Sequence, residues 1–225
     1  MNNLYSLPAT KEHVAPAFIE PHSLAIRIWH WTFFLVLTAS LITVLFGSTL
    51  FKTKRNISVV QMQLQEKGVI VSKDQARAVA HMYSDKLWDL HKIIGYVLCG
   101  LLLSRVIIEL TQPGEEKLSA KLKKAFGFKS RNPAEKREQQ HYIGVKWTYV
   151  VFYSLILTMA LTGLGLAFED YPVLKEWHRS ISQVHSFIQY LIYGFILIHL
   201  IGVVRSDLGN NKGLVSGMIH GKKRI

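Results

Sequence analysis

The stretch that decides the fold is VHSFIQYLIYGFILIHLIGVV, which occupies residues 184–204. Its 21 residues include no Asp, Glu, Lys or Arg. A bilayer core about 30 Å thick is crossed by about 20 apolar residues in a helix, because each residue adds about 1.5 Å. The stretch is therefore predicted to be a membrane-spanning helix. It carries one histidine near each end, His185 and His199.

Three further apolar segments have the same character, and they occupy residues 24–51, 87–110 and 147–168. The first has no charge between Arg27 and Lys52, and the third has no charge at all. The second is charged only near its ends, where a side chain can reach the interface. Four such segments predict an all-α integral membrane four-helix bundle, with residues 1–225 as a single membrane domain.

The chain is both basic and hydrophobic. Lys plus Arg is 27 and Asp plus Glu is 15, so the net charge is +12, while 49% of the residues are hydrophobic. Basic loops between apolar helices account for both properties, so we expect no nucleic-acid partner. If the N-terminus is inside, 17 of the 27 basic residues lie on the inner side. This bias predicts that both termini are cytoplasmic.

Two features that the sequence lacks narrow the possible cofactors and the processing of the N-terminus. The single Cys99 excludes an intrachain disulfide, a cysteine-ligated iron–sulfur cluster and the C-x-x-C-H attachment of a c-type haem. The first twenty residues lack the charged start and early apolar core of a signal peptide, so we expect the N-terminal stretch to be retained.

Four histidines lie at two matching depths in the predicted bundle. His185 and His199 are fourteen residues apart, so they lie within about 40° of one face and about 21 Å apart along the helix. Because successive spans run in opposite directions, His30 lies at the inner depth with His199, and His91 at the outer depth with His185. Two six-coordinate haems require two such pairs on facing helices. His178, seven residues before His185, is the alternative outer ligand.

Three more residues are candidates for binding the same cofactors. Gly95 follows His91 by four residues and leaves room for a flat ring beside the helix. Arg105 points the same way as His91 at the inner depth, and Arg27 lies one turn before His30. Either arginine can pair with a haem propionate or a quinone headgroup, or can instead extend to the membrane interface.

Four features of the sequence together carry a resemblance to a known family. They are RIWHW at residues 27–31, H-x-x-x-G-Y at residues 91–96 with Arg105, the pair His185 and His199, and residues 204–221. They resemble motifs of the bacterial cytochrome b561 and nickel–iron hydrogenase cytochrome b family. The resemblance covers nearly all four spans, and the tail is similar to the C-terminal end of hydrogenase b-type cytochrome subunits.

The resemblance implies non-covalent haem b and electron exchange between a quinone pool and a redox partner. It also implies that His30, His91, His185 and His199 are the axial ligands of two haems b. The predicted protein is a di-haem b cytochrome of the bacterial cytoplasmic (inner) membrane and its respiratory chain. It is expected to be an electron-transfer subunit of a membrane oxidoreductase, such as a hydrogenase, with an extracytoplasmic or membrane redox subunit as partner.

Two other functions stay open at the level of the sequence. One is a stand-alone superoxide:quinone oxidoreductase of cytochrome b561 type, and the other is a haem-free membrane scaffold or metal carrier. The long loops are equally open. Residues 52–86 contain two amphipathic pieces and either dock a partner or connect two spans. The basic residues 111–141 either reflect topology alone or contact anionic membrane lipid.

Overall fold

The computed structural model describes residues 23–130, 132–208 and 214–221, and the regular structure in these ranges is helical throughout. The elements are α1 (Leu24–Ser48), α2 (Thr53–Glu66), α3 (Lys73–Thr111), the 3-10 turn η1 (Gly114–Glu116), α4 (Leu118–Gly127), α5 (Pro133–Ala167), α6 (Pro172–Leu208) and α7 (Leu214–His220).

Four of these helices, α1, α3, α5 and α6, are long and apolar enough to cross a membrane. The prediction of an all-α bundle with four spans is therefore confirmed. Three of the helices are much longer than the predicted spans. The 39 residues of α3 extend for about 58 Å, roughly twice the thickness of a bilayer core, so this helix must project beyond it.

The polar starts of the long helices are fixed by their capping residues. The Ser72 side chain accepts a hydrogen bond from Gln75 N, and the Gln75 side chain accepts one from Ser72 N, which is a complete capping box. At the start of α5, Asn132 accepts from Glu135 N, and Pro133 occupies the first turn. Each helix therefore begins well before its apolar part.

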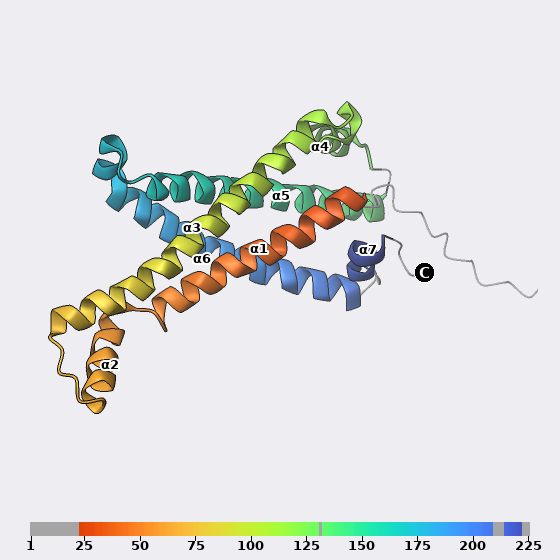
Figure 1. The fold of residues 1–225 in the computed structure, drawn as a ribbon. Helices are drawn as coiled ribbons and strands as arrows, with labels where there is room; N and C mark the ends of the chain where they lie inside the picture. The colour runs from red at the N-terminus through yellow and green to blue at the C-terminus, as the bar shows by residue number, and fades with distance from the viewer. Residues whose placement is uncertain (1–22, 131, 209–213, 222–225) are drawn as a thin grey trace, which may run out of the picture.

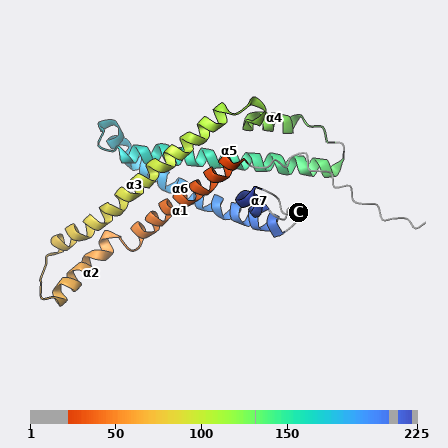
Figure 2. The ribbon, with the colours of Figure 1, turned by 45° about the vertical axis from the view of Figure 1, so that its right-hand side comes forward.

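The bundle consists of two crossing pairs of helices (Figures 1 and 2). α1 packs along α3, α5 packs along α6, and contacts between α3 and α5 join the two pairs. The described chain starts and finishes at one end of the bundle, beside α4 and α7 (Figure 1). We call this the α7 end. The opposite end, with α2, the start of α3 and the turn between α5 and α6, is the α2 end.

The core is small for a chain of this size. Its buried centre lies where the helix pairs meet and comprises Phe33, Leu102, Ile156, Ile188 and Ile192. In α3, α5 and α6, only 6% of the most apolar 18-residue window is buried inside the protein. The remaining apolar surface must be covered by lipid or by a cofactor, since exposure to water would be unfavourable.

The two long loops contain helices of their own. The segment 52–86 forms a helical hairpin in which α2 packs on the first turns of α3 around Ile57, Ala76 and Ala80. In the segment 111–141, α4 is joined to α5 by Gln139, whose Nε2 donates to the carbonyls of Ala125 at 2.6 Å and Phe128 at 2.9 Å. Neither loop is an irregular connector.

Candidate functional site

The first histidine pair lies toward the α2 end, between α3 and α6. The ring centroids of His91 and His185 are 6.5 Å apart, and the ring planes are at 88°. Each ring also contacts a threonine on a third or fourth helix. Thr43 Oγ1 of α1 lies 2.8 Å from His91 Nδ1, and Thr162 Oγ1 of α5 lies 3.0 Å from His185 Nδ1. All four spans therefore contribute to this level of the bundle.

The second pair lies toward the α7 end, between α1 and α6. His30 and His199 have the same centroid separation of 6.5 Å, with ring planes at 54°. The neighbours of this pair are aromatic. Phe195 stacks on His199 with 6.2 Å between centroids and 8° between planes, and Trp31 meets His30 edge-on at 5.6 Å. The structure thus brings together the two pairs of histidines that the sequence grouped by depth.

The competing ligand His178 is engaged elsewhere. Its Nε2 lies 2.8 Å from Glu169 Oε2, and about half of its side chain is exposed. His81 makes a similar exposed contact with Asp85 at 2.6 Å. His13 and His22 lie outside the described residues. Within the ranges that the structure covers, His, Cys, Asp and Glu form no cluster of three or more that could hold a metal ion.

Arg105 lies in the interior, on α3 near the α7 end. Its Nε donates to Tyr153 Oη at 3.1 Å, and its Nη1 is 3.4 Å from Glu109 Oε2. The Nη1 atom is buried and makes no hydrogen bond with any described residue. Glu109 is itself occupied, because its Oε1 accepts from Leu118 N at 2.6 Å. The guanidinium therefore retains donor capacity toward an anion.

Arg27 lies where α1 meets α7. Its Nη1 donates to Ile219 O at 3.0 Å, and Trp31 Nε1 donates to Met218 O at 3.2 Å. These bonds satisfy carbonyls at the end of α7, where a cation is also favoured by the helix dipole. The Nε of Arg27 is buried and has no hydrogen-bond partner in the described part of the chain. Arg27 thus attaches α7 to α1 and still has one free donor.

The glycines of the bundle differ in what surrounds them. A Cβ placed on Gly95 would meet nothing within 4 Å, so open space lies beside α3 one turn from His91. A Cβ on Gly163 would lie 3.2 Å from His185 Cε1. Gly163 therefore lets the imidazole of His185 approach α5 closely.

Sequence reasoning missed three residues of this site: Thr43, Thr162 and Gly163. The sequence does indicate the depth of each threonine in the membrane. Each threonine lies at the outer depth of one of the two spans that carry no outer histidine. Which way each threonine faces depends on the rotation of the helices, which the sequence pattern alone does not set.

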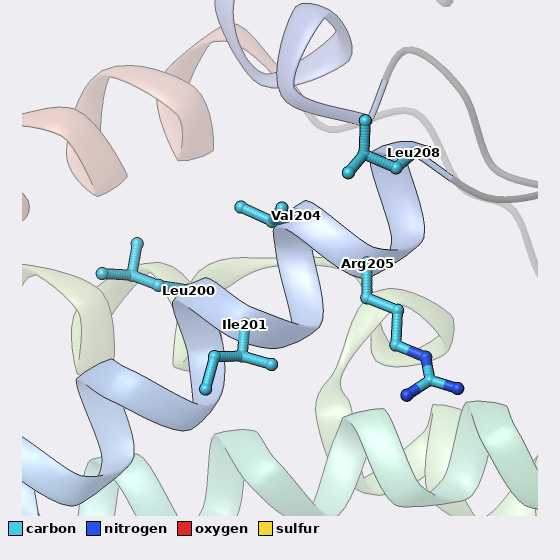
Figure 3. Close-up of a pocket in the computed structure, with 5 residues that line it drawn as sticks. All are labelled: Leu200, Ile201, Val204, Arg205 and Leu208. Atoms are coloured by element: carbon cyan, nitrogen blue, oxygen red, sulfur yellow. The ribbon is translucent and has the colours of Figure 1, made fainter.

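An open groove runs along α6 at the α7 end, with a volume of about 610 Å³ (Figure 3). None of the predicted site residues lines it. Four apolar side chains and one cation form the groove, an arrangement that suits lipid near the membrane interface. The lining residues are Leu200, Ile201, Val204, Arg205 and Leu208.

Four membrane-length helices with two pairs of facing histidines are the arrangement expected of a membrane cytochrome. The chain belongs to the prokaryotic cytochrome b561 family, whose match covers residues 21–221. The family implies b-type haem, electron transfer and a multi-pass bacterial membrane location. No curated protein and no solved structure matches the chain significantly.

The paired histidines fit this cofactor. Imidazole nitrogens bind a metal ion at about 2 Å, so two that share one ion from opposite sides are roughly 4 Å apart, with ring centres roughly 6 Å apart. Both observed separations of 6.5 Å agree with this requirement. The open space beside Gly95 suits a flat macrocycle, and Arg27 Nε and Arg105 Nη1, which make no hydrogen bond with the described residues, suit its carboxylates.

Proposed function

We propose that the protein is a di-haem b cytochrome that transfers electrons between a redox partner and the quinone pool. His91 and His185 would hold one haem, and His30 and His199 would hold the other. The observation that carries the proposal is the repeated separation of 6.5 Å in two pairs on facing helices. A single pair would serve one haem only, whereas two levels allow electrons to cross the membrane in two shorter steps.

The chain supplies ligands, orientation and electrostatics, and a bound haem supplies one-electron redox chemistry at its iron. At the α7 end, Arg27 and Arg105 offer donors to haem propionates or to a quinone headgroup. Gly95 leaves space for a ring edge next to α3. At the His91–His185 level, side chains of all four spans surround the half-buried rings, and such a shell limits the access of water and lowers the local dielectric constant.

The proposal includes a direction for the chain in the membrane. The α7 end faces the cytoplasm, because the basic residues of α4 and its flanking segments collect there. The His91–His185 pair then lies near the extracytoplasmic surface of the inner membrane. The two levels are about 21 Å apart along α6, the rise of fourteen helical residues.

The test is the reduced-minus-oxidised absorption spectrum of the purified full-length protein together with its haem-to-protein ratio. We expect a b-type spectrum and a ratio near two haems per chain. His185→Ala and His199→Ala should each lower the ratio toward one, and the double variant should lower it toward zero. His178→Ala is the matched control on the same helix and should retain both haems. A ratio near one in the unaltered protein, or full retention in the His185 and His199 variants, would overturn the assignment.

A second experiment separates a subunit from a stand-alone enzyme. Purification in mild detergent from the native membrane should retain a redox partner if the chain is a subunit of a hydrogenase or a similar oxidoreductase. Turnover of superoxide with quinone by the isolated chain would instead assign it the stand-alone activity. The first measurement uses the protein purified from its native membrane, and the second uses the chain without any partner.

A further inference from the structure

The His91–His185 pair is built with two threonine contacts of the same kind. Thr43 Oγ1 lies 2.8 Å from His91 Nδ1, and Thr162 Oγ1 lies 3.0 Å from His185 Nδ1. The two threonines come from different helices, α1 and α5, and face histidines on two others, α3 and α6. The arrangement therefore occurs twice, independently, at one level of the bundle.

The direction of these hydrogen bonds follows from the other contact of each hydroxyl. Thr43 Oγ1 donates to Ser40 O at 2.6 Å, and Thr162 Oγ1 donates to Thr158 O at 2.7 Å. A hydroxyl has one hydrogen to donate and two lone pairs that accept. Once that hydrogen is directed at a backbone carbonyl, the oxygen can only accept from the imidazole. We therefore assign the hydrogen of the neutral imidazole to Nδ1 in both His91 and His185.

This assignment has a direct consequence for ligation. A neutral imidazole with its hydrogen on Nδ1 has a lone pair on Nε2, which is the atom left to bind a metal. Donation from Nδ1–H also makes the imidazole a more basic ligand, as outer hydrogen-bond partners of metal-bound histidines do. A more basic ligand favours the ferric over the ferrous state.

We propose that Thr43 and Thr162 are positioning residues that hold His91 and His185 in the Nδ1–H tautomer and lower the reduction potential of the haem they bind. The inference rests on the proposed function, since it requires these histidines to be haem ligands. The other pair differs. His199 makes no hydrogen bond with the described residues and is held by the ring of Phe195. The threonine effect is thus confined to one of the two haems.

The experiment is a redox titration of the purified holoprotein carrying Thr43→Val, Thr162→Val or both. Valine keeps the shape of threonine and removes the hydroxyl. We expect each variant to keep two haems. The reduction potential of the His91–His185 haem should rise, and that of the other haem should stay unchanged. If the ratio of the ligands' affinities for ferric and ferrous iron falls tenfold, the reduction potential of this one-electron couple rises by about 59 mV. The haem-deficient variant His185→Ala identifies which transition that is.

Two further variants make the result specific. Thr43→Ser and Thr162→Ser retain the hydroxyl and should restore the original potential. Thr158→Val is the matched control, because Thr158 Oγ1 donates to Ser154 O at 2.9 Å on the same helix as Thr162. It removes an equivalent backbone-bonded hydroxyl one turn away and should leave both potentials unchanged.

Three outcomes would overturn the inference. The first is an unchanged potential in both valine variants. The second is a fall in potential, which would mean that the hydroxyls donate to Nδ1. The third is an equal shift in Thr158→Val, which would indicate a general effect on α5. Failure of the proposed function is distinguishable, because it appears as full haem retention when His91 and His185 are replaced.

Discussion

The two histidine pairs have the same ring separation but different supports. The pair at the α2 end, His91 and His185, is held by threonine hydroxyls at 2.8 and 3.0 Å. The pair at the α7 end, His30 and His199, is surrounded by aromatic rings, with Phe195 stacked on His199. Hydrogen bonds fix the rotation of a ring and its tautomer, whereas stacking fixes only its plane. If both pairs bind haem as proposed, the two haems have different side chains in contact with their histidines.

The pairs also differ in how the surrounding helices close around them. At the α2 end, His185 closely approaches α5 at Gly163, while open space remains beside α3 at Gly95. At the α7 end, two arginines with buried free nitrogens and the short helix α7 lie near the pair. The first level therefore has one histidine packed closely against a neighbouring helix, and the second is rich in donors for anionic groups. Each difference can be tested by a substitution that should affect one end of the bundle and spare the other.

The largest effect is expected at Gly163. A Cβ there would lie 3.2 Å from His185 Cε1, so the longer side chain of Gly163→Leu must displace the imidazole. We predict that this variant loses most of the haem bound by His91 and His185. The haem-to-protein ratio should fall from near two toward one, and the spectrum of the remaining haem should be unchanged.

The control for this variant is Gly100→Leu on α3. A Cβ at Gly100 meets nothing within 4 Å, and the residue lies on the side of the helix opposite His91. The control should keep both haems. If Gly163→Leu also keeps both haems with an unaltered spectrum, the close contact of His185 with α5 at Gly163 would not limit haem binding at this level.

A moderate effect is expected at Arg27, on the side of His30 and His199. Arg27→Gln removes the hydrogen bond from Nη1 to Ile219 O, and a bond from a charged donor contributes about 1.5–3 kcal/mol. Because α7 has only seven residues, it depends on such contacts for stability. We predict that hydrogen–deuterium exchange of the α7 amides becomes faster by about tenfold or more.

Arg205→Gln provides the comparison for Arg27. Arg205 is also a cation at the α7 end, but it lines the open groove on α6 (Figure 3). Exchange of the α7 amides should be unaffected by this change. Exchange that is equally fast in both variants would mean that α7 is held by overall charge and not by the Arg27 bond.

The sequence was sufficient to predict which histidines face each other and not which side chains support them, and the reason is geometric. The rise per residue sets the depth of a side chain along a helix, so His30, His91, His185 and His199 could be paired by counting. The contact of Thr162 with His185 depends on how α5 and α6 rotate against each other. That rotation results from packing of the whole bundle, which no local pattern encodes.

Some helix boundaries can likewise be predicted from the sequence, and others cannot. The capping box of Ser72 and Gln75 is visible in the sequence and marks the start of α3 fourteen residues before the predicted span. Apolar content alone placed the start at residue 87, because the projecting part of the helix is polar. The docking of α7 on α1 left no comparable signal, since Arg27 and Trp31 donate to main-chain carbonyls, which every residue offers.

The smallest effect is expected at Tyr153. A substitution there tests whether Arg105 supports the level of His30 and His199 or the whole bundle. Tyr153→Phe keeps the ring next to Trp29 and removes only the hydroxyl that accepts from Arg105 Nε at 3.1 Å. We predict a loss of about 1 kcal/mol in stability, measured as an earlier loss of haem absorbance on denaturation. Tyr193→Phe removes an exposed bond from Gln189 and should cost less.

Because Arg105 lies at the level of His30 and His199, the haem of that pair should be lost first in Tyr153→Phe. If the His91–His185 haem were lost first instead, Arg105 would support the whole bundle and not one level of it.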